Sequence, residues 1–231
     1  MTVAENPLYK DLVKQFGDAL HDAAFITEKP KQIISVSPKL DLALGGGVPE
    51  GSLFIMTGPE KIGKTVTALS FCANAQSQER FVYYGNIEGR LKKRDLEGIR
   101  ELQLGPEQFQ MVGSSEGNIL SGEDYLGIFD KVVHGHPKSV AVVDSFSALA
   151  AEAELAGELK DIQVMSIQKT QAKWCRRIGN VLPINNVTVV GITHMMANVS
   201  SFGSRKTKTE KSGTSLKYQV DVKLEASHSE A

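Results

Sequence analysis

The residues with the clearest chemical meaning lie in the segment GPEKIGKT, from Gly58 to Thr65. Their spacing matches G-x-x-x-x-G-K-[ST], which is typical of a phosphate-binding loop between a strand and a helix. Gly58 and Gly63 allow backbone angles that a side chain would hinder, so successive N–H groups can turn toward an anion. Lys64 would place a positive charge near the β- and γ-phosphates, and the Thr65 hydroxyl would bind Mg²⁺. The alternative is a glycine-rich turn before a surface helix.

Three polar residues follow other apolar segments of the chain. Asp144 closes the run Val140–Val143, while Glu88 and His194 each come shortly after or at the end of a strand-like segment. The carboxyl ends of parallel strands meet at one edge of a sheet, and ligands bind there. We therefore expect these three side chains to lie near Gly58.

Each of the three residues has a predicted role. The Asp144 carboxylate would lie next to Mg²⁺, and Glu88 is the candidate general base that orients the attacking water. His194 would sense the γ-phosphate and pass that information to the segment after it. Each residue also has an alternative without chemistry. Asp144 could cap a turn, Glu88 could be a solvated carboxylate at the start of a helix, and His194 could be a polar side chain that is merely hydrogen-bonded.

The predicted site residues fall into three groups. The catalytic group comprises Lys64, Glu88 and His194; the metal ligands are Thr65 and Asp144; and the nucleotide contacts are Gly58, Pro59, Glu60, Lys61, Ile62, Gly63, Lys64, Thr65, Val66 and Asp144.

The hydrophobic pattern predicts alternating strands and helices. Strands are expected at 32–36, 53–56, 81–84, 109–112, 140–143, 187–192 and 216–224, and helices at 7–20, 66–75, 90–102, 125–133 and 162–181, with turns or loops at 37–51 and 198–213. Such alternation favours an α/β fold with a mostly parallel sheet and helices on both faces. Val66 is expected on the buried face of its helix.

Composition narrows the class of protein. The chain has 231 residues, a formal net charge of -1, 41% hydrophobic and 23% charged residues, which is typical of one globular domain. No run of eighteen apolar residues occurs, and the N-terminus does not resemble a signal peptide, so we expect a cytoplasmic protein. Cys72 and Cys175 are predicted to be buried thiols. His134 and His136 are interpreted as part of a turn.

A basic segment runs from Phe202 to Gly213. It carries Arg205, Lys206, Lys208 and Lys211 against the single acidic residue Glu210. Such a segment suits the phosphate backbone of single-stranded DNA. The alternative is a solvated surface loop.

Three segments together resemble the RecA-type homologous recombinases over most of the chain. The segment VAVVDSFSALAAEAELAGELKD, at 140–161, is similar to that family's second nucleotide motif and first DNA-binding loop. LDLALGGGVPEG before the phosphate loop is also family-like. VVGITHMMANVSSFG followed by SGTSLKY is similar to the switch strand, second DNA-binding loop and return strand. The resemblance implies a RecA-like P-loop ATPase core.

The resemblance also implies residue roles. Lys64 and Thr65 would bind ATP and Mg²⁺, Asp144 would hold the metal, and Glu88 would be the catalytic carboxylate. His194 takes the position of a γ-phosphate-sensing amide, as in the T-even-phage type of recombinase. The loops 154–161 and 195–213 would line the DNA, with Gly157 and Phe202 among the contacts. Arg94 is an alternative to the aromatic residue that stacks on adenine in bacterial forms.

The implied function is that of an ATP-dependent DNA recombinase core, in the cytoplasm of a bacterium or of a phage-infected cell. Residues 1–30 would form an N-terminal helix and linker that dock on the next protomer, 31–226 the ATPase core, and 227–231 a polar tail. The expected partners are single-stranded DNA, homologous duplex DNA, and further copies in a filament or ring. Family members continue past the strand ending near Leu224, so this chain is expected to be naturally minimal, or to be completed by a second polypeptide as a further partner, or to be part of a longer protein. The alternatives are a repair regulator or helicase motor of the same fold, and a nucleotide-binding module without turnover.

Overall fold

The computed structural model describes residues 6–20, 31–157, 166–197, 208–210 and 214–227. By internal contacts the chain divides into two compact units, Met1–Gln32 and Ile33–Ala231. Among the described helices, none has both the length and the apolar character needed to cross a membrane.

The first unit contains the predicted N-terminal helix. Helix α1 (Pro7–Phe16) begins after Asn6, whose side chain accepts a hydrogen bond from the Leu8 amide at 2.9 Å, and Pro7 occupies the first helical turn. A short 3₁₀ turn, η2 (Gly17–Ala19), follows it. The apolar side chains Leu8 and Phe16 are exposed.

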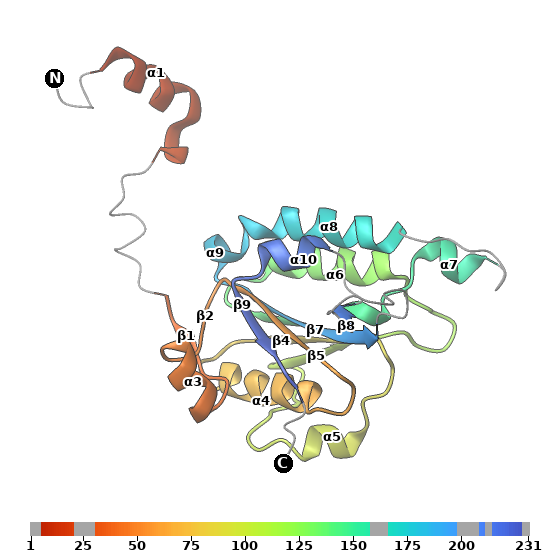
Figure 1. Cartoon of the computed structure of the whole chain (residues 1–231). Coiled ribbons are helices and arrows are strands. Elements are labelled where there is room, and N and C mark those ends of the chain that lie inside the picture. The colour runs from red at the N-terminus through yellow and green to blue at the C-terminus, as the bar shows by residue number, and fades with distance from the viewer. Residues whose placement is uncertain (1–5, 21–30, 158–165, 198–207, 211–213, 228–231) are drawn as a thin grey trace. The chain divides into compact units, whose positions relative to one another are not determined.

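The second unit is built on a parallel sheet, as predicted (Figure 1). Its strands are β3 (Leu53–Gly58), β4 (Val82–Asn86), β5 (Phe109–Val112), β6 (Val140–Asp144), β7 (Thr188–Ala197) and β9 (Val222–Glu225). They lie in the order β5-β4-β6-β7-β3-β9, and every neighbouring pair is parallel. A short strand, β8 (Lys208–Glu210), pairs antiparallel with the end of β7.

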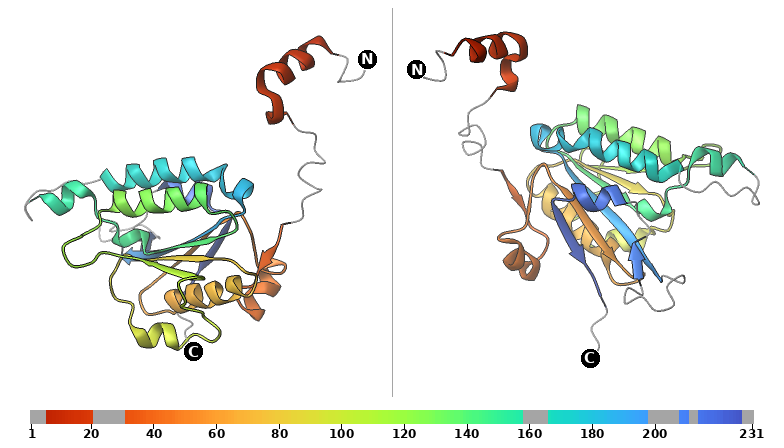
Figure 2. Two further views of the ribbon diagram at one scale, coloured as in Figure 1. Left: turned by 180° about the vertical axis from the view of Figure 1, so that it is seen from behind. Right: turned by 45° about the horizontal axis from the view of Figure 1, so that its top comes forward.

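Helices cover both faces of the sheet, as Figures 1 and 2 show. One face carries α6 (Gly122–Gly135), α8 (Ser166–Gly179), α9 (Leu182–Asn185) and α10 (Thr214–Gln219), and the other carries α4 (Lys64–Gln76). The remaining helices are α3 (Pro38–Leu44), α5 (Lys93–Glu97), η3 (Phe146–Ala148) and α7 (Glu152–Ala156).

The alternation of side chains along the buried strands produces two apolar cores. In β3, Leu53 and Ile55 pack toward α6 and α8, whereas Phe54 and Met56 pack toward α4. All six residues of β3 are buried. Cys72 and Cys175 are both buried, as predicted, and they lie in opposite cores.

The predicted helix at 90–102 is wrong in length, because α5 covers only Lys93–Glu97. The helix ends at Gly98, and Glu101 has φ 65°, which a right-handed helix cannot contain. Leu91 and Ile99 lie outside the helix, but their side chains still pack on the core. The apolar pattern therefore identified core-facing residues correctly, although the backbone at both positions is irregular.

The prediction of one strand over 216–224 is wrong in its first part and confirmed at 222–224. Helix α10 occupies the first part, with Leu216 buried, and β9 begins only at Val222. Asp221 separates the two elements, because its carboxylate accepts a hydrogen bond from the Leu53 amide at 2.8 Å and its own amide bonds to the Leu53 carbonyl.

Three further boundaries differ from prediction. The strand expected at 32–36 is reduced to β1 (Ile33–Ile34), which pairs antiparallel with β2 (Val48–Pro49) outside the main sheet. The stretch 37–51, expected to be a turn, contains α3, which ends at Gly45 in a left-handed conformation. Strand β7 continues to Ala197 because β8 supplies a pairing partner, and β8 therefore lies within the predicted loop 198–213.

Candidate nucleotide-binding site

The phosphate-loop segment joins β3 to α4, as its spacing predicts. Gly58 has φ 153°, and a Cβ there would lie 2.5 Å from the carbonyl oxygen of Ala226. Gly63 has φ 91° and directly precedes α4. Both positions therefore need the freedom of glycine, one for a close backbone approach and the other for a left-handed turn.

Lys64 is buried at the start of α4, and its ammonium group folds back on the loop. Nζ donates to the Gly58 carbonyl at 2.9 Å and to the carbonyl of Pro59. Burial lowers the pKa of Lys64, whereas the carboxylates of Asp144 and Glu88 oppose that change. The two carbonyl oxygens thus hold the ammonium group beside the loop, where a phosphate oxygen could replace them.

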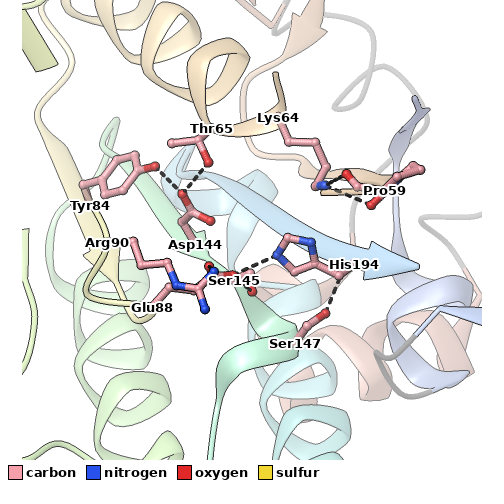
Figure 3. A network of polar contacts seen from close by, with 11 residues as sticks. Pro59, Lys64, Thr65, Tyr84, Glu88, Arg90, Asp144, Ser145, Ser147 and His194 are labelled. Carbon is pink, nitrogen blue, oxygen red and sulfur yellow. Dashed lines mark hydrogen bonds and ion pairs between the residues drawn. The ribbon is translucent and has the colours of Figure 1, made fainter. Parts of the chain in front are cut away.

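Thr65 and Asp144 meet across the cleft between α4 and β6 (Figure 3). The Thr65 hydroxyl donates to Asp144 Oδ2 at 3.0 Å, and the Tyr84 hydroxyl donates to the same oxygen at 2.7 Å. Burial raises the pKa of Asp144, although the hydrogen bonds from Tyr84 and Thr65 act in the opposite direction. The two predicted metal ligands are thus in direct contact.

Glu88 and His194 form the second polar pair of the site (Figure 3). Glu88 Oε1 accepts from His194 Nε2 at 2.8 Å and from the Ser145 hydroxyl at 2.9 Å. Burial favours a higher pKa for Glu88, but the hydrogen bonds from His194 and Ser145 outweigh it and leave the pKa below its ordinary value. Because an ionised carboxylate only accepts hydrogen bonds, His194 carries its proton on Nε2.

His194 is fixed from the backbone as well. Its amide donates to the Ser147 hydroxyl at 2.9 Å, and it pairs in register with Gly58. The predicted position at the end of a strand is wrong, because β7 continues for three residues beyond His194. Its place beside the phosphate loop is nevertheless as expected.

These residues line one cleft of about 490 Å³. Of the predicted site residues, Glu60, Lys61, Gly63, Lys64, Thr65, Val66, Glu88, Asp144 and His194 line it. The prediction of a buried Val66 is wrong: its side chain is 55% exposed, because it faces this cleft from the first turn of α4. Gly58 and Pro59 contribute carbonyl oxygens to Lys64, and Ile62 is half-buried in the loop.

The predicted DNA-contacting residues are described only in part. Gly157 is exposed and directly follows α7, and Lys208 begins β8. Phe202, Arg205, Lys206 and Lys211 lie outside the described residues.

The two histidines interpreted as a turn lie at the end of α6. His134 Nδ1 contacts the Asp130 carbonyl oxygen at 2.7 Å, and His136 Nδ1 contacts the Tyr83 hydroxyl at 2.8 Å. His134 thus belongs to the last turn of the helix, and His136 is its C-cap.

Several residues of the site were not identified from the sequence. Tyr84, Ser145, Ser147 and Arg90 all contact predicted site residues, and Arg90 lies 3.8 Å from the Glu88 carboxylate. In the sequence, Tyr84 looks like an ordinary strand residue. Its hydroxyl reaches the Asp144 carboxylate because β4 pairs with β6. Ser145 was recognisable as the neighbour of Asp144, but its contact with Glu88 depends on that same pairing.

Comparison with known proteins is consistent with this geometry. The family model of the RecA N-terminal domain matches residues 9–231. The chain belongs to this family. The resemblance to RecA-type proteins and the α/β fold that it implied are therefore confirmed.

Individual relatives named Protein RecA match most of this RecA-family chain. The Streptomyces venezuelae protein is 30% identical over 229 residues, which cover 96% of this chain and 55% of the relative. The Bifidobacterium longum protein is 30% identical over 218 residues, covering 92% and 52%, and that of Mycolicibacterium smegmatis is 32% identical over 209 residues, covering 86% and 56%. The chain thus spans about half the length of the curated relatives that it matches.

Proposed function

We propose that this chain is an ATP-binding and ATP-hydrolysing core that acts with single-stranded DNA in homologous recombination. The proposal is carried by one observation. The carboxylate of Glu88 lies in the same cleft as Lys64 and Thr65, and it accepts a hydrogen bond from His194, the residue of β7 that pairs in register with Gly58. Membership of the RecA family supports it.

The described residues fit ATP with Mg²⁺. Mg²⁺ prefers oxygen ligands and is usually held by one or two protein oxygens together with substrate phosphates. The Thr65 hydroxyl and the Asp144 carboxylate supply such oxygens within 3.0 Å of one another. When bound, the ion would neutralise charge on the β- and γ-phosphates. Lys64 would exchange its carbonyl partners for phosphate oxygens.

Glu88 is the proposed group that orients the attacking water. Such a group must be ionised and must lie within hydrogen-bond reach of the water that it polarises. The hydrogen bonds from Ser145 and His194 keep the pKa of Glu88 low, so the carboxylate is ionised near neutrality. Both bonds go to Oε1, which leaves Oε2 beside Arg90 and on the cleft.

His194 is the proposed link between nucleotide and DNA. Its ring bonds to Glu88, and the Nδ1 atom is buried with no hydrogen-bond partner among the described residues. A γ-phosphate that draws the His194 ring toward it would change this bond and shift β7 and the basic segment that follows. Such a switch is the kind that responds to a γ-phosphate in other nucleotide-dependent proteins.

The proposed DNA contacts are Gly157, Phe202, Arg205, Lys206, Lys208 and Lys211, from the two loops that the family resemblance assigns to DNA. The proposed assembly is a filament or ring in which the exposed apolar side chains of α1 dock on the next copy. The proposed products are paired and exchanged strands, with homologous duplex DNA as the second substrate.

Steady-state ATP turnover with and without single-stranded DNA tests the proposal. We expect DNA to stimulate the wild-type protein, Glu88→Gln to bind ATP without turning it over, and Lys64→Ala to lose ATP affinity. Glu116→Gln, at an exposed position, is the matched control and should behave as wild type. A joint-molecule assay with homologous duplex DNA then tests strand pairing.

Each alternative function predicts a different outcome. Turnover that ignores DNA, or DNA-stimulated turnover without strand pairing, would indicate another ATPase of this fold, such as a repair regulator or helicase motor. ATP binding without any turnover would indicate a nucleotide-dependent binding module. Unchanged nucleotide affinity in Lys64→Ala would refute the whole proposal.

A further inference from the structure

Tyr84 occupies a buried position in the middle of the sheet. It lies in β4 opposite Val142 of β6, and two residues further along the same pair of strands Asn86 lies opposite Asp144. The Tyr84 side chain is fully buried in the core beneath α4. Its ring stacks on that of Phe109, with centroids 6.1 Å apart and planes 18° apart. The ring is therefore fixed by packing, and the hydroxyl projects toward the end of β6.

Among the described residues, the Tyr84 hydroxyl has a single hydrogen-bond partner, a carboxylate oxygen of Asp144. It donates to Asp144 Oδ2 at 2.7 Å, and the Thr65 hydroxyl donates to that same oxygen at 3.0 Å (Figure 3). Burial raises the pKa of Tyr84 well above its ordinary value, so the phenol keeps its proton and stays a donor. Two donors of different elements thus converge on Oδ2.

We propose that Tyr84 is a positioning residue for the divalent cation, acting through Asp144. The inference rests on the proposed function, because the cation would be held by Thr65 and Asp144 together with phosphate oxygens. Tyr84 donates to Oδ2 from β4, and Thr65 donates to it from α4. The carboxylate is thereby fixed in the orientation that keeps it beside the Thr65 hydroxyl.

Chemistry supports a role beyond packing. A phenylalanine would fill nearly the same space and make the same ring contact with Phe109, so packing alone does not require the hydroxyl. A buried carboxylate that lacks donors is costly and turns more easily away from a cation. Partners that hydrogen-bond to metal ligands typically change metal affinity by about 10- to 100-fold when they are removed. Tyr84 has the position and the geometry of such a partner.

The test is a titration of Mn²⁺ into the protein–ADP complex. The electron paramagnetic resonance signal of free Mn²⁺ measures how much of the ion is bound. We expect Tyr84→Phe to weaken Mn²⁺ binding by about 10-fold while leaving ADP affinity in EDTA unchanged. Tyr83→Phe is the matched control. It removes the neighbouring hydroxyl of the same strand, which contacts His136 and not the cleft, and should leave Mn²⁺ affinity as in wild type.

A double-mutant cycle with Asp144→Asn separates positioning from general destabilisation. If Tyr84 acts through Asp144, Tyr84→Phe will have no further effect on Mn²⁺ affinity once Asp144 is Asn. Unchanged Mn²⁺ affinity in Tyr84→Phe, or an equal loss in both backgrounds, would overturn the inference. If instead the wild-type protein binds no ADP at all, the proposed function fails, and that result is distinguishable from the loss of positioning.

Discussion

The two carboxylates of the cleft have opposite pKa shifts because their neighbours differ. Glu88 accepts hydrogen bonds from His194 and Ser145, and these outweigh its burial. Asp144 is more deeply enclosed, and there burial outweighs the hydrogen bonds from Tyr84 and Thr65. The neighbours of Glu88 favour an ionised carboxylate that can act as a base. The burial of Asp144 instead disfavours its ionised form, which a bound cation would stabilise.

Asp144 therefore has a predictable effect on stability in the absence of nucleotide and metal. Its folded-state pKa is above the unfolded value, so the folded protein loses stability as pH rises from the ordinary range of aspartate, about 4, through the folded-state pKa. Asp144→Asn removes this dependence. Urea unfolding in EDTA at several pH values should show wild type losing stability relative to Asp144→Asn as pH rises. A stability difference that does not change with pH would contradict the assignment.

At the scale of elements, a buried ion pair ties the entry of β3 to the connection between α4 and β4. Arg80 and Glu50 are both buried and in contact, and Arg80 also donates to the Asn186 carbonyl at 3.2 Å, just before β7. Glu50→Ala leaves the guanidinium buried without this carboxylate, so we expect a loss of about 3–5 kcal/mol in the free energy of unfolding. Chemical denaturation measures it.

The matched control for this pair is Glu97→Ala. Glu97 lies 3.4 Å from Lys93 in an exposed pair on α5, and such pairs contribute less than about 1 kcal/mol. Equal effects of the two substitutions would show that the buried pair has no special role in joining the elements.

Packing of β7 against its neighbours makes a second prediction at this scale. A Cβ at Gly191 would lie 2.4 Å from the Phe146 ring and 2.5 Å from Ile55 Cδ1. Gly191→Ala should therefore destabilise the protein by about 1–3 kcal/mol. Gly127→Ala in α6 is the control, because nothing lies within 4 Å of its Cβ position, and alanine there should stabilise the helix by up to about 1 kcal/mol. Thermal unfolding of the two variants should move in opposite directions.

Sequence patterns predicted the elements that carry strong local signals and missed those that depend on partners. The apolar run before Asp144 and the glycines of the phosphate loop identified β6, β3 and the start of α4 correctly. The extension of β7 past His194 depends on β8, which no local pattern reveals. The same reason explains Tyr84: its contact with Asp144 follows from the register of β4 on β6.

At the scale of the whole molecule, the proposed DNA contacts depend on charge. If Arg205, Lys206 and Lys208 contact phosphates, replacing them with glutamine will flatten the dependence of log affinity on log salt concentration for single-stranded DNA. The expected change is up to about 0.7 per lost contact. Fluorescence anisotropy of a labelled oligonucleotide measures the slope. Replacing Lys131, exposed on α6, is the control. An unchanged slope in the triple variant would indicate that the basic segment is a solvated surface loop without phosphate contacts.

The central claim is that Glu88 orients the water that hydrolyses ATP. Single-turnover hydrolysis of γ-labelled ATP in the presence of single-stranded DNA measures this step directly. We expect Glu88→Gln to bind ATP as wild type does and to release phosphate at least about 100-fold more slowly, since general base catalysis contributes 10²–10⁴-fold. A Glu88→Gln variant that releases phosphate at the wild-type rate would contradict the account.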